Sequence, residues 1–354
     1  MTLLETLGID LPIIQAPMAG VSSPAMAAAV SNAGALGSIG VGATDAEGAR
    51  GMIAAVRERS KRSLNVNVFC HRPATVDDAL EAAWLERLRP HFERSGAKPP
   101  SGLKEIYRSF VEDDAMLAAL LAVKPRVVSF HFGVPPAERI RALREAGIVL
   151  LASATNIAEG RAVVNAGVHA VVAQGFEAGG HRGVFDPDAA DDCLGTMALT
   201  RLLVVQLDVP VIAAGGIMDG AGIAAVLRLG ASAAQLGTAF IACTESDADA
   251  GYREALTGNA AEHTVMTRAI SGRPARCLRN RFTELGEDLS PRQIPSYPIA
   301  YDAGKALNAA AKAAHDAGYG AQWAGQGAPL ARELPAAELV ASLAGELGRA
   351  LQAR

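Results

Sequence analysis

A histidine beside two glycines is the first candidate for chemistry in this chain of 354 residues. His181 lies in the run QGFEAGGHRGVF (174–185), shortly after an apolar stretch. An imidazole with its ordinary pKa of about 6.5 can act as a base or as a fixed cation. The glycines allow a ligand to approach the backbone closely. His181 is therefore the candidate catalytic residue, although a loop histidine can also be simply solvated or hydrogen-bonded.

Other polar side chains offer hydrogen-bond donors and positive charge without a metal. Tyr301 and Lys305 are four residues apart in PIAYDAGKAL, so on a helix they would point to one side. His131 ends the strand-like run RVVSFHF (126–132). Such donors suit an anionic substrate. Ordinary packing is the alternative, with His131 as a satisfied core histidine and Lys305 as a solvated helix residue.

Two glycine-containing turns indicate a phosphate site. They lie in AAGGIMDG (213–220) and QLGTAF (235–240), and each follows an apolar run. Backbone N–H groups at such turns, with a short helix N-terminus and a threonine hydroxyl, bind phosphate. Ordinary turn glycines are the alternative, and no GK[ST] run indicates a nucleoside triphosphate. The predicted cofactor contacts here are Gly215, Gly216, Gln235, Leu236, Gly237 and Thr238.

A phosphate site beside a flat, polar-lined floor suits flavin mononucleotide (FMN). The pyrimidine edge of an isoalloxazine ring needs amide donors and acceptors, its N5 edge needs close backbone approach, and the ribityl chain needs room. These needs can be met by two amide side chains, by the loop after the first apolar run and by a glycine pair. The predicted contacts are Ala16, Pro17, Met18, Asn67, Gln174, Gly179 and Gly180.

Eight short apolar runs must position these residues. They alternate with alanine-rich helical stretches, and runs that are apolar throughout are typical of a parallel sheet buried on both faces. Eight successive βα units predict an α/β fold, a (β/α)8 TIM barrel with functional side chains at the carboxyl ends of its strands. A doubly wound sheet is disfavoured because no GxGxxG follows the first run. The runs span 12–15, 36–40, 64–69, 126–132, 148–153, 168–174, 209–215 and 232–237.

Two stretches interrupt the barrel pattern. Residues 241–325 predict a smaller, mainly helical domain that is inserted after the eighth strand and covers the substrate. The amphipathic run at 334–352 predicts the returning eighth barrel helix. The barrel would then comprise 1–240 and 326–354, with an excursion at about 70–112 that is marked by Pro, Gly and charged residues.

Composition argues against several classes of partner and site. The net charge is −4 and no Lys/Arg stripe occurs, which disfavours nucleic acid and anionic membranes. No apolar run approaches the roughly 20 residues of a membrane helix, and the N-terminal stretch has no basic signal-peptide region, so we expect a cytoplasmic protein. The cysteine spacing predicts reduced thiols and no metal site at Cys70, Cys193, Cys243 and Cys277.

Local pairings are also expected around the candidate site. Glu177 and Arg182 are expected to pair and order the loop that carries His181. The basic run from Arg268 to Arg281 is expected to form a solvated face or salt bridges across the domain junction. The remaining histidines are expected to be structural or on the surface: His71, His91, His169, His263 and His315.

Six motifs together resemble the nitronate monooxygenase family, formerly called 2-nitropropane dioxygenases. They are QAPMAG, NVNVF, SFHFG, QGFEAGGHRG, AAGGIMDG and QLGTAF, and AGGHRG is the most specific of them. The resemblance covers nearly the whole chain. It implies FMN-dependent oxidation of alkyl nitronates by O₂ to a carbonyl compound and nitrite, a detoxification of propionate 3-nitronate. It also implies that His181 is catalytic and that a bacterial class I substrate pocket is formed by Tyr107, His131, Tyr252, Tyr301 and Lys305.

Other functions stay open on the sequence alone. An NAD(P)H-dependent FMN reductase of quinones or enoyl thioesters could use the same barrel. A flavin-free isomerase or aldolase would use Lys305 in a Schiff base. A non-enzymatic module would leave the convergent His, Tyr and Lys unexplained. Either a monomer or a homodimer is compatible with the sequence.

Overall fold

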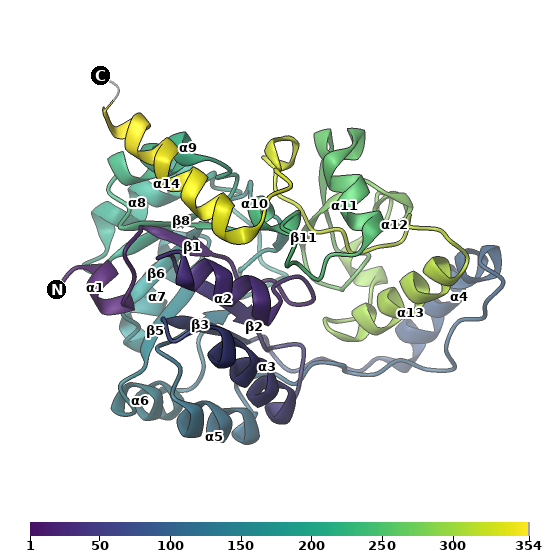
Figure 1. Ribbon diagram of the computed structural model, residues 1–354. Helices are drawn as coiled ribbons and strands as arrows, with labels where there is room; N and C mark the ends of the chain where they lie inside the picture. Colours follow the sequence, from purple (N-terminus) through teal and green to yellow (C-terminus); the bar gives the residue numbers. More distant parts are fainter. Residues whose placement is uncertain (353–354) are drawn as a thin grey trace.

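Eight parallel strands form a closed barrel in the computed structural model, which describes residues 1–352 (Figure 1). Their hydrogen-bonded order is β1-β9-β8-β6-β5-β4-β3-β2. A parallel bridge between Ile14 and Leu36 joins β1 to β2 and closes the circle. The predicted TIM barrel is therefore confirmed. Its strands are β1 (Ile13–Gln15), β2 (Gly37–Gly40), β3 (Leu64–Phe69), β4 (Val127–His131), β5 (Val149–Ala154), β6 (Ala170–Gln174), β8 (Val211–Ala214) and β9 (Ala233–Leu236).

Helices surround the barrel, and most begin at a side chain that caps them. Ser23, Asp45, Asp113, Asn156 and Asp219 each accept a hydrogen bond from a backbone N–H of the first turn. None of the helices within residues 1–352 has the length and hydropathy to cross a membrane. The outer helices are α2 (Pro24–Asn32), α3 (Ala46–Arg59), α5 (Asp114–Val123), α6 (Ala137–Glu145), α7 (Ile157–Ala166), α8 (Thr196–Gln206), α9 (Gly220–Arg228) and α14 (Ala336–Gln352).

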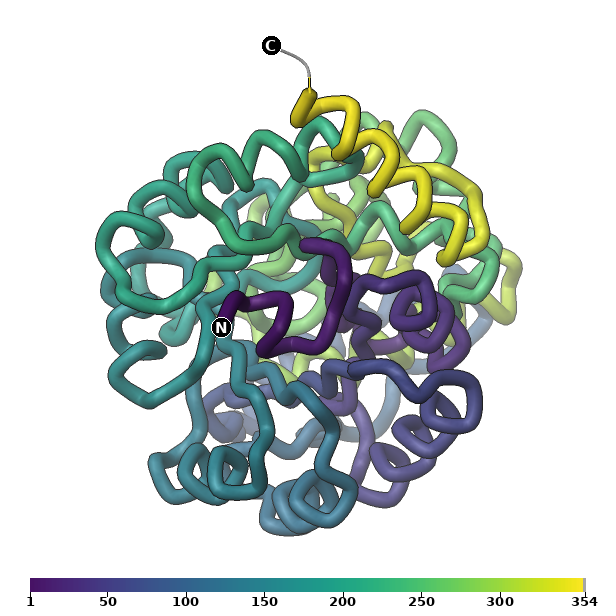
Figure 2. Tube along the Cα trace, turned by 60° about the vertical axis from the view of Figure 1, so that its left-hand side comes forward, coloured from purple at the N-terminus to yellow at the C-terminus, as the bar shows by residue number. Residues whose placement is uncertain are grey.

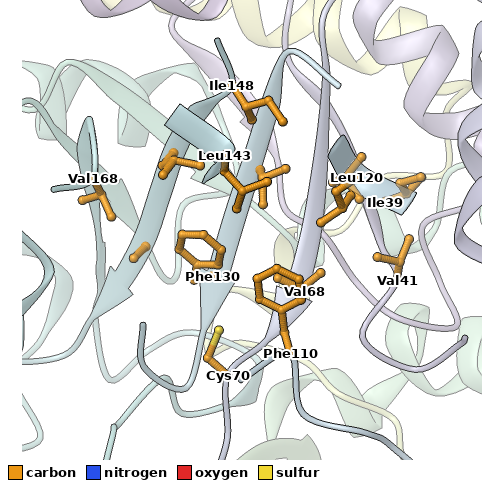
Figure 3. Close-up of a cluster of buried hydrophobic side chains, with 14 of the residues drawn as sticks. Ile39, Val41, Val68, Cys70, Phe110, Leu120, Phe130, Leu143, Ile148 and Val168 are labelled. Carbon is orange, nitrogen blue, oxygen red and sulfur yellow. The ribbon is translucent and has the colours of Figure 1, made fainter. Parts of the chain in front are cut away.

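Alternate residues of each strand belong to two apolar layers. Val68 and Phe130 face outward and pack against Leu120 and Leu143 of the surrounding helices (Figure 3). Each such side chain stabilises the fold by about 1.5–3 kcal/mol on burial. The inward-facing layer is closed at the amino-terminal end of the barrel by α1 (Leu3–Leu7), which lies across that end (Figure 2). The opposite end, at the carboxyl ends of the strands, is therefore the expected place for a ligand.

A second group of elements covers those carboxyl ends, and we call it the cap. It contains a three-stranded antiparallel sheet in the order β10-β11-β7. Helices α4 and α13 pack side by side within it (Figure 1). The cap elements are α4 (Asp78–Arg94), β7 (Gly180–His181), α11 (Ala250–Thr257), β10 (Thr264–Thr267), β11 (Ala275–Leu278), α12 (Arg281–Leu285) and α13 (Ile299–Ala313).

The cap differs in two ways from the expected helical insertion at 241–325. The excursion at 70–112 supplies α4, whose Trp84 and Leu88 are buried in one cluster with Leu307 of α13. The loop after β6 supplies β7, so the cap also contains a small sheet. The physical reason is burial, because the apolar face of α4 is covered by α13.

Candidate active site

A cavity of about 580 Å³ lies at the carboxyl ends of the barrel strands, between barrel and cap. Leu236 was predicted to contact a cofactor, but it does not line the cavity, because its side chain is buried in the core with Ala234 and Phe240. The other predicted site residues all line it: Ala16, Pro17, Met18, Asn67, Tyr107, His131, Gln174, Gly179, Gly180, His181, Gly215, Gly216, Gln235, Gly237, Thr238, Tyr252, Tyr301 and Lys305.

His181 lies on β7, which pairs with β11 opposite Ala275. Its Nε2 is 2.9 Å from the Ser271 hydroxyl oxygen. Burial, helped by the nearby positive charge of Arg273 and by the imidazoles of His131 and His71, lowers the pKa of His181 to about 3. The ring is therefore neutral at physiological pH and is not a fixed cation.

His131 holds β7 in place with both of its ring nitrogens engaged. Nδ1 is 2.9 Å from the Ser153 hydroxyl oxygen, and Nε2 is 3.2 Å from the carbonyl oxygen of His181. Burial lowers the pKa of His131 to about 4. The Gln174 amide donates to the same His181 carbonyl at 3.0 Å and accepts from the Gly183 N–H at 2.7 Å. Both side chains therefore position the loop that carries His181, although they also line the cavity.

The expected pairing of Glu177 with Arg182 is wrong. Arg182 is 1% exposed and forms a bidentate ion pair with Asp191, at 2.7 and 2.9 Å. Its remaining nitrogen donates to the carbonyls of Gln174 and Gly175. Glu177 instead accepts from the backbone N–H and the hydroxyl of Thr196. Arg182 thus ties the loop to the end of β6, immediately beside His181.

The glycine turns after β8 and β9 meet at one end of the cavity. Gly215 and Gly216 have φ angles of 122° and 68°, which favour glycine. The helix α10 (Thr238–Ile241) starts directly after Gly237, so its first N–H groups have no partner within the helix. The Thr238 hydroxyl oxygen accepts from the Gly325 N–H at 3.0 Å. These groups bring glycine turns and the N-terminus of α10 together at one end of the cavity, and Thr238 also holds the chain that returns from the cap.

The glycine pair at 179–180 has a packing role in addition to the predicted place beside a cofactor. A Cβ on Gly179 would collide with the backbone of Ala324 and Gly325. Gly180 has a φ of 73° and lies against Trp323. These glycines therefore allow the returning chain to pack on β7, whereas the sequence had suggested only room for a ribityl chain.

Aromatic and basic side chains of the cap form the other end of the cavity. Lys305 Nζ lies 4.9 Å from the ring centre of Tyr107 and 5.6 Å from that of Tyr301. Burial lowers the pKa of Lys305 and raises the pKa of Tyr301 to about 12. The Tyr301 hydroxyl accepts from Trp323 Nε1 at 3.4 Å, which leaves its proton available. The Tyr252 hydroxyl instead donates to the Trp323 carbonyl, so its proton is engaged.

Four residues of this site were missed by the sequence reasoning. Tyr297 packs 5.4 Å from the His181 ring, and it could have been found because it precedes Tyr301 by four residues, as Tyr301 precedes Lys305. Trp323 lies 5.0 Å from the His181 ring and has no sequence signal. Ser271 and Arg273 belong to the basic run that was expected to be solvated or salt-bridged, yet both are buried.

Arg273 brings an unusual buried charge close to the site. Its guanidinium lies 4.2 Å from the ring centre of Phe132 and donates to the carbonyl of Val184. Burial lowers its pKa to about 10. Across residues 1–352, no group of three or more His, Cys, Asp or Glu side chains could hold a metal ion. Arg273 therefore contributes positive charge near His181.

Comparison with known proteins identifies the family. The model of the nitronate monooxygenase family matches residues 1–346. The chain is 64% identical to a nitronate monooxygenase of Paraburkholderia phytofirmans over 350 residues, covering 99% of this chain and 96% of that one. It is 56% identical to a nitronate monooxygenase of Pseudomonas aeruginosa over 343 residues, covering 96% and 97%.

Solved structures agree with this assignment. A nitroalkane oxidase from Streptomyces ansochromogenes superposes with a TM-score of 0.90 at 43% identity, covering 99% of both chains. FabK from Thermotoga maritima superposes with a TM-score of 0.75 at 30% identity, covering 99% of this chain and 96% of that one. The protein is therefore an enzyme, and the chain belongs to the nitronate monooxygenase family.

Proposed function

We propose that the enzyme binds FMN in the cavity and uses O₂ to oxidise alkyl nitronates, with propionate 3-nitronate preferred, to a carbonyl compound and nitrite. One observation carries this proposal. The neutral His181 imidazole lies in the same cavity as the glycine turns after β8 and β9 and the Tyr301–Lys305 pair. The cavity would thus combine glycine turns that bind a phosphate, an imidazole that can accept a proton, and a Tyr–Lys pair that binds an anionic substrate. We further propose that the reaction is a detoxification in the cytoplasm by a monomer or homodimer.

The polar atoms around the cavity fit FMN. The phosphate would lie at Gly215, Gly216 and Gly237, where the N-terminus of α10 opens. The Asn67 amide nitrogen donates to the carbonyl and hydroxyl of Ser129, which leaves its oxygen as an acceptor for an N–H of the flavin ring. When bound, the flavin supplies the electron transfer from nitronate and the reaction with O₂.

The loop after β1 would approach the flavin ring, and internal hydrogen bonds hold it in place. The Met18 N–H donates to the Ser22 hydroxyl at 2.9 Å, and the buried Gln15 amide donates to the same hydroxyl at 2.8 Å. Gln15 also accepts from the Ser38 N–H at 2.9 Å. The Ala16–Met18 backbone is therefore anchored to β1 and β2 before a cofactor arrives.

The cap end of the cavity suits a substrate with two anionic groups. The Tyr301 hydroxyl can donate to a nitronate oxygen, and Lys305 is placed to attract a carboxylate at the mouth. A nitronate carbon is already electron-rich, so no strong base is needed for it. A neutral nitroalkane must first lose a proton from carbon, and the neutral His181 imidazole is the group that can accept it.

Nitrite yield from purified enzyme loaded with FMN tests this function. We expect nitrite from propionate 3-nitronate under air, and less from the neutral nitro form of the same compound. The absence of nitrite with every nitronate at full FMN occupancy would contradict the proposal. Anaerobic addition of NADH distinguishes nitronate oxidation from the reductase alternative. Rapid bleaching of the flavin absorbance would favour a reductase, whereas a persistent yellow colour would favour nitronate oxidation.

A further inference from the structure

Two unpaired charges of opposite sign face the active-site cavity. Its acidic and basic lining residues, apart from the neutral histidines, are Lys305, Lys312, Asp247 and Asp249. Lys312 Nζ lies 2.5 Å from Asp249 Oδ2, so these two charges neutralise each other. Neither Lys305 nor Asp247 forms an ion pair with another of the described residues 1–352, and the Asp247 carboxylate accepts no hydrogen bond from them. A ligand in the cavity therefore meets one free cation and one free anion.

Helix α13 sets the order of the charges along the cavity. Tyr301, Lys305, Asn308 and Lys312 follow one another at intervals of four, three and four residues, so they share one face of the helix, and all four line the cavity. The Tyr301 ring lies 5.9 Å from the His181 ring. With the helical rise, Lys305 comes about 6 Å after Tyr301 and Lys312 about 10 Å after Lys305. The helix therefore leads from the imidazole toward the outside.

The Lys312–Asp249 pair marks the outer rim of the cavity. Both side chains line the cavity, and yet each is 46% exposed. Asp247 precedes Asp249 by two residues, so their Cα atoms are at most about 7 Å apart. The Asp247 N–H donates to the Val21 carbonyl at 3.0 Å, which fixes this segment to the loop after β1. The free carboxylate of Asp247 therefore lies at the rim, farther out than Lys305.

The charge of Asp247 is not compensated at this rim. Partial burial raises the pKa of Asp247, and no neighbouring cation lowers it. The side chain is nevertheless exposed, so it remains a carboxylate at neutral pH. The nearby ammonium of Lys312 is held by Asp249. An anionic group of a ligand at the rim would therefore be repelled, whereas a cationic group would be attracted.

The wall between Lys305 and the rim suits an uncharged chain. The Asn308 Oδ1 atom is buried and has no hydrogen-bond partner within residues 1–352. An amide of this kind can bind a neutral polar group. Ala317, Gly320 and Ala321 also line the cavity, and their small side chains leave room for a ligand. A substrate longer than a three-carbon acid can therefore extend past Lys305.

We propose that Asp247 is a specificity-determining residue: it excludes nitronates with a second anionic group beyond the reach of Lys305, and it admits nitronates with neutral or cationic tails. This inference rests on the proposed function, because it defines the substrate class of the same site. The carboxylate of propionate 3-nitronate would end at Lys305 and avoid Asp247. A longer chain with a terminal carboxylate would bring its anion to the rim, where like charges oppose binding.

Binding of unreactive six-carbon acids to the FMN-loaded enzyme tests the proposal directly. Hexanoate, hexanedioate and 6-aminohexanoate share a carboxylate head that stands in for the nitronate, and they differ only in the charge of the tail. By isothermal titration calorimetry we expect hexanedioate to bind about ten-fold more weakly than hexanoate, and 6-aminohexanoate at least as tightly as hexanoate. Asp247→Asn should abolish this order, whereas Asp247→Glu should retain it.

The matched control is Glu254→Gln, which removes an exposed negative charge of α11 that does not line the cavity. We expect this variant to keep the wild-type order of the three acids. Equal binding of hexanoate and hexanedioate by the wild type, or an unchanged order in Asp247→Asn, would overturn the inference. Asp247→Asn should also keep its FMN, measured by flavin absorbance, because loss of FMN would assign the carboxylate to the cofactor instead.

Turnover provides a second and independent readout. We expect the wild type to oxidise the preformed nitronate of 6-nitrohexanoate with a kcat/KM about ten-fold below that of the nitronate of 1-nitrohexane. Asp247→Asn should bring the two values together, and a persistent difference would overturn the inference. If the wild type formed no nitrite from any nitronate, the proposed function would fail, while the binding of the three acids would still decide the role of Asp247.

Discussion

His181 owes its neutral state to burial and to a neighbouring cation. The same features that lower its pKa leave it as a neutral imidazole that lines the cavity. Replacing it by asparagine keeps the polarity and approximate size of the side chain. We expect His181→Asn to retain FMN, because the phosphate end lies on other loops, and to lose about 10²- to 10⁴-fold in kcat with a neutral nitroalkane. Flavin absorbance and nitrite release measure the two effects, and loss of the flavin would contradict this division of roles.

The pH profile follows from the direction of the same shift. A base is active when unprotonated, and a pKa of about 3 keeps His181 unprotonated far below its ordinary 6.5. We therefore expect kcat/KM for a neutral nitroalkane, corrected for substrate ionisation, to stay level from about pH 8 to pH 5. Arg273→Gln should raise the pKa of His181, so that activity begins to fall at a pH nearer neutrality. The control Arg273→Lys keeps the charge and should keep the wild-type profile. An acid limb near pH 6.5 in the wild type would refute this.

Two tyrosines of the site should respond differently to loss of their hydroxyls. Tyr301 has a free proton at the cavity, whereas Tyr252 donates its proton to the Trp323 carbonyl. We expect Tyr301→Phe to raise KM for a nitronate about 10- to 100-fold, since a hydrogen bond to a charged group contributes roughly 1.5–3 kcal/mol. Tyr252→Phe should instead lower the melting temperature and leave KM nearly unchanged. Steady-state kinetics and thermal unfolding of both variants provide the comparison, and the opposite pattern would reverse these roles.

At the scale of elements, the strand β7 depends on a buried ion pair in the loop that follows it. Asp191→Asn would leave the buried Arg182 guanidinium without its charge partner. Because Asp191 is partly exposed, we expect a loss of roughly 2–3 kcal/mol in unfolding free energy, below the full effect of breaking a buried pair. The matched control is Asp188→Asn, whose carboxylate is mostly exposed beside Arg268, so this pair should contribute less than about 1 kcal/mol. Equal effects of both variants in chemical denaturation would contradict the special role of Arg182.

The elements that the sequence predicted well are those whose formation depends on residues close together in the sequence. Each barrel strand is an apolar run that is buried on both faces, and the Gly215–Gly216 turn has positive φ angles that favour glycine. β7 is different, because it consists of two residues with no alternating pattern and exists only through its pairing with β11, more than ninety positions away. The partner of Arg182 was equally hidden, since Glu177 and Asp191 are both near in sequence and only the folded loop distinguishes them.

At the scale of the whole molecule, the active site needs segments that are far apart in the sequence. The barrel contributes the glycine turns and the amide side chains, while α13 contributes Tyr301 and Lys305. Helix α4 comes from the excursion after β3 and supports α13 from the side away from the barrel (Figure 1). The sequence predicted both interruptions of the barrel but not their association, because an amphipathic helix does not specify which apolar surface covers it.

The support of α13 by α4 should therefore control substrate binding from a distance. Trp84 is buried in the cluster that joins the two helices, so Trp84→Ala should destabilise the protein by about 3–5 kcal/mol and loosen the placement of Tyr301 and Lys305. We expect KM for a nitronate to rise while FMN occupancy stays close to that of the wild type. Ile53→Ala, on the buried face of α3 that packs against the barrel, should lower the melting temperature comparably without changing KM. If both variants changed KM equally, general loss of stability would explain the effect, and α4 would have no specific part in positioning the substrate end of the site.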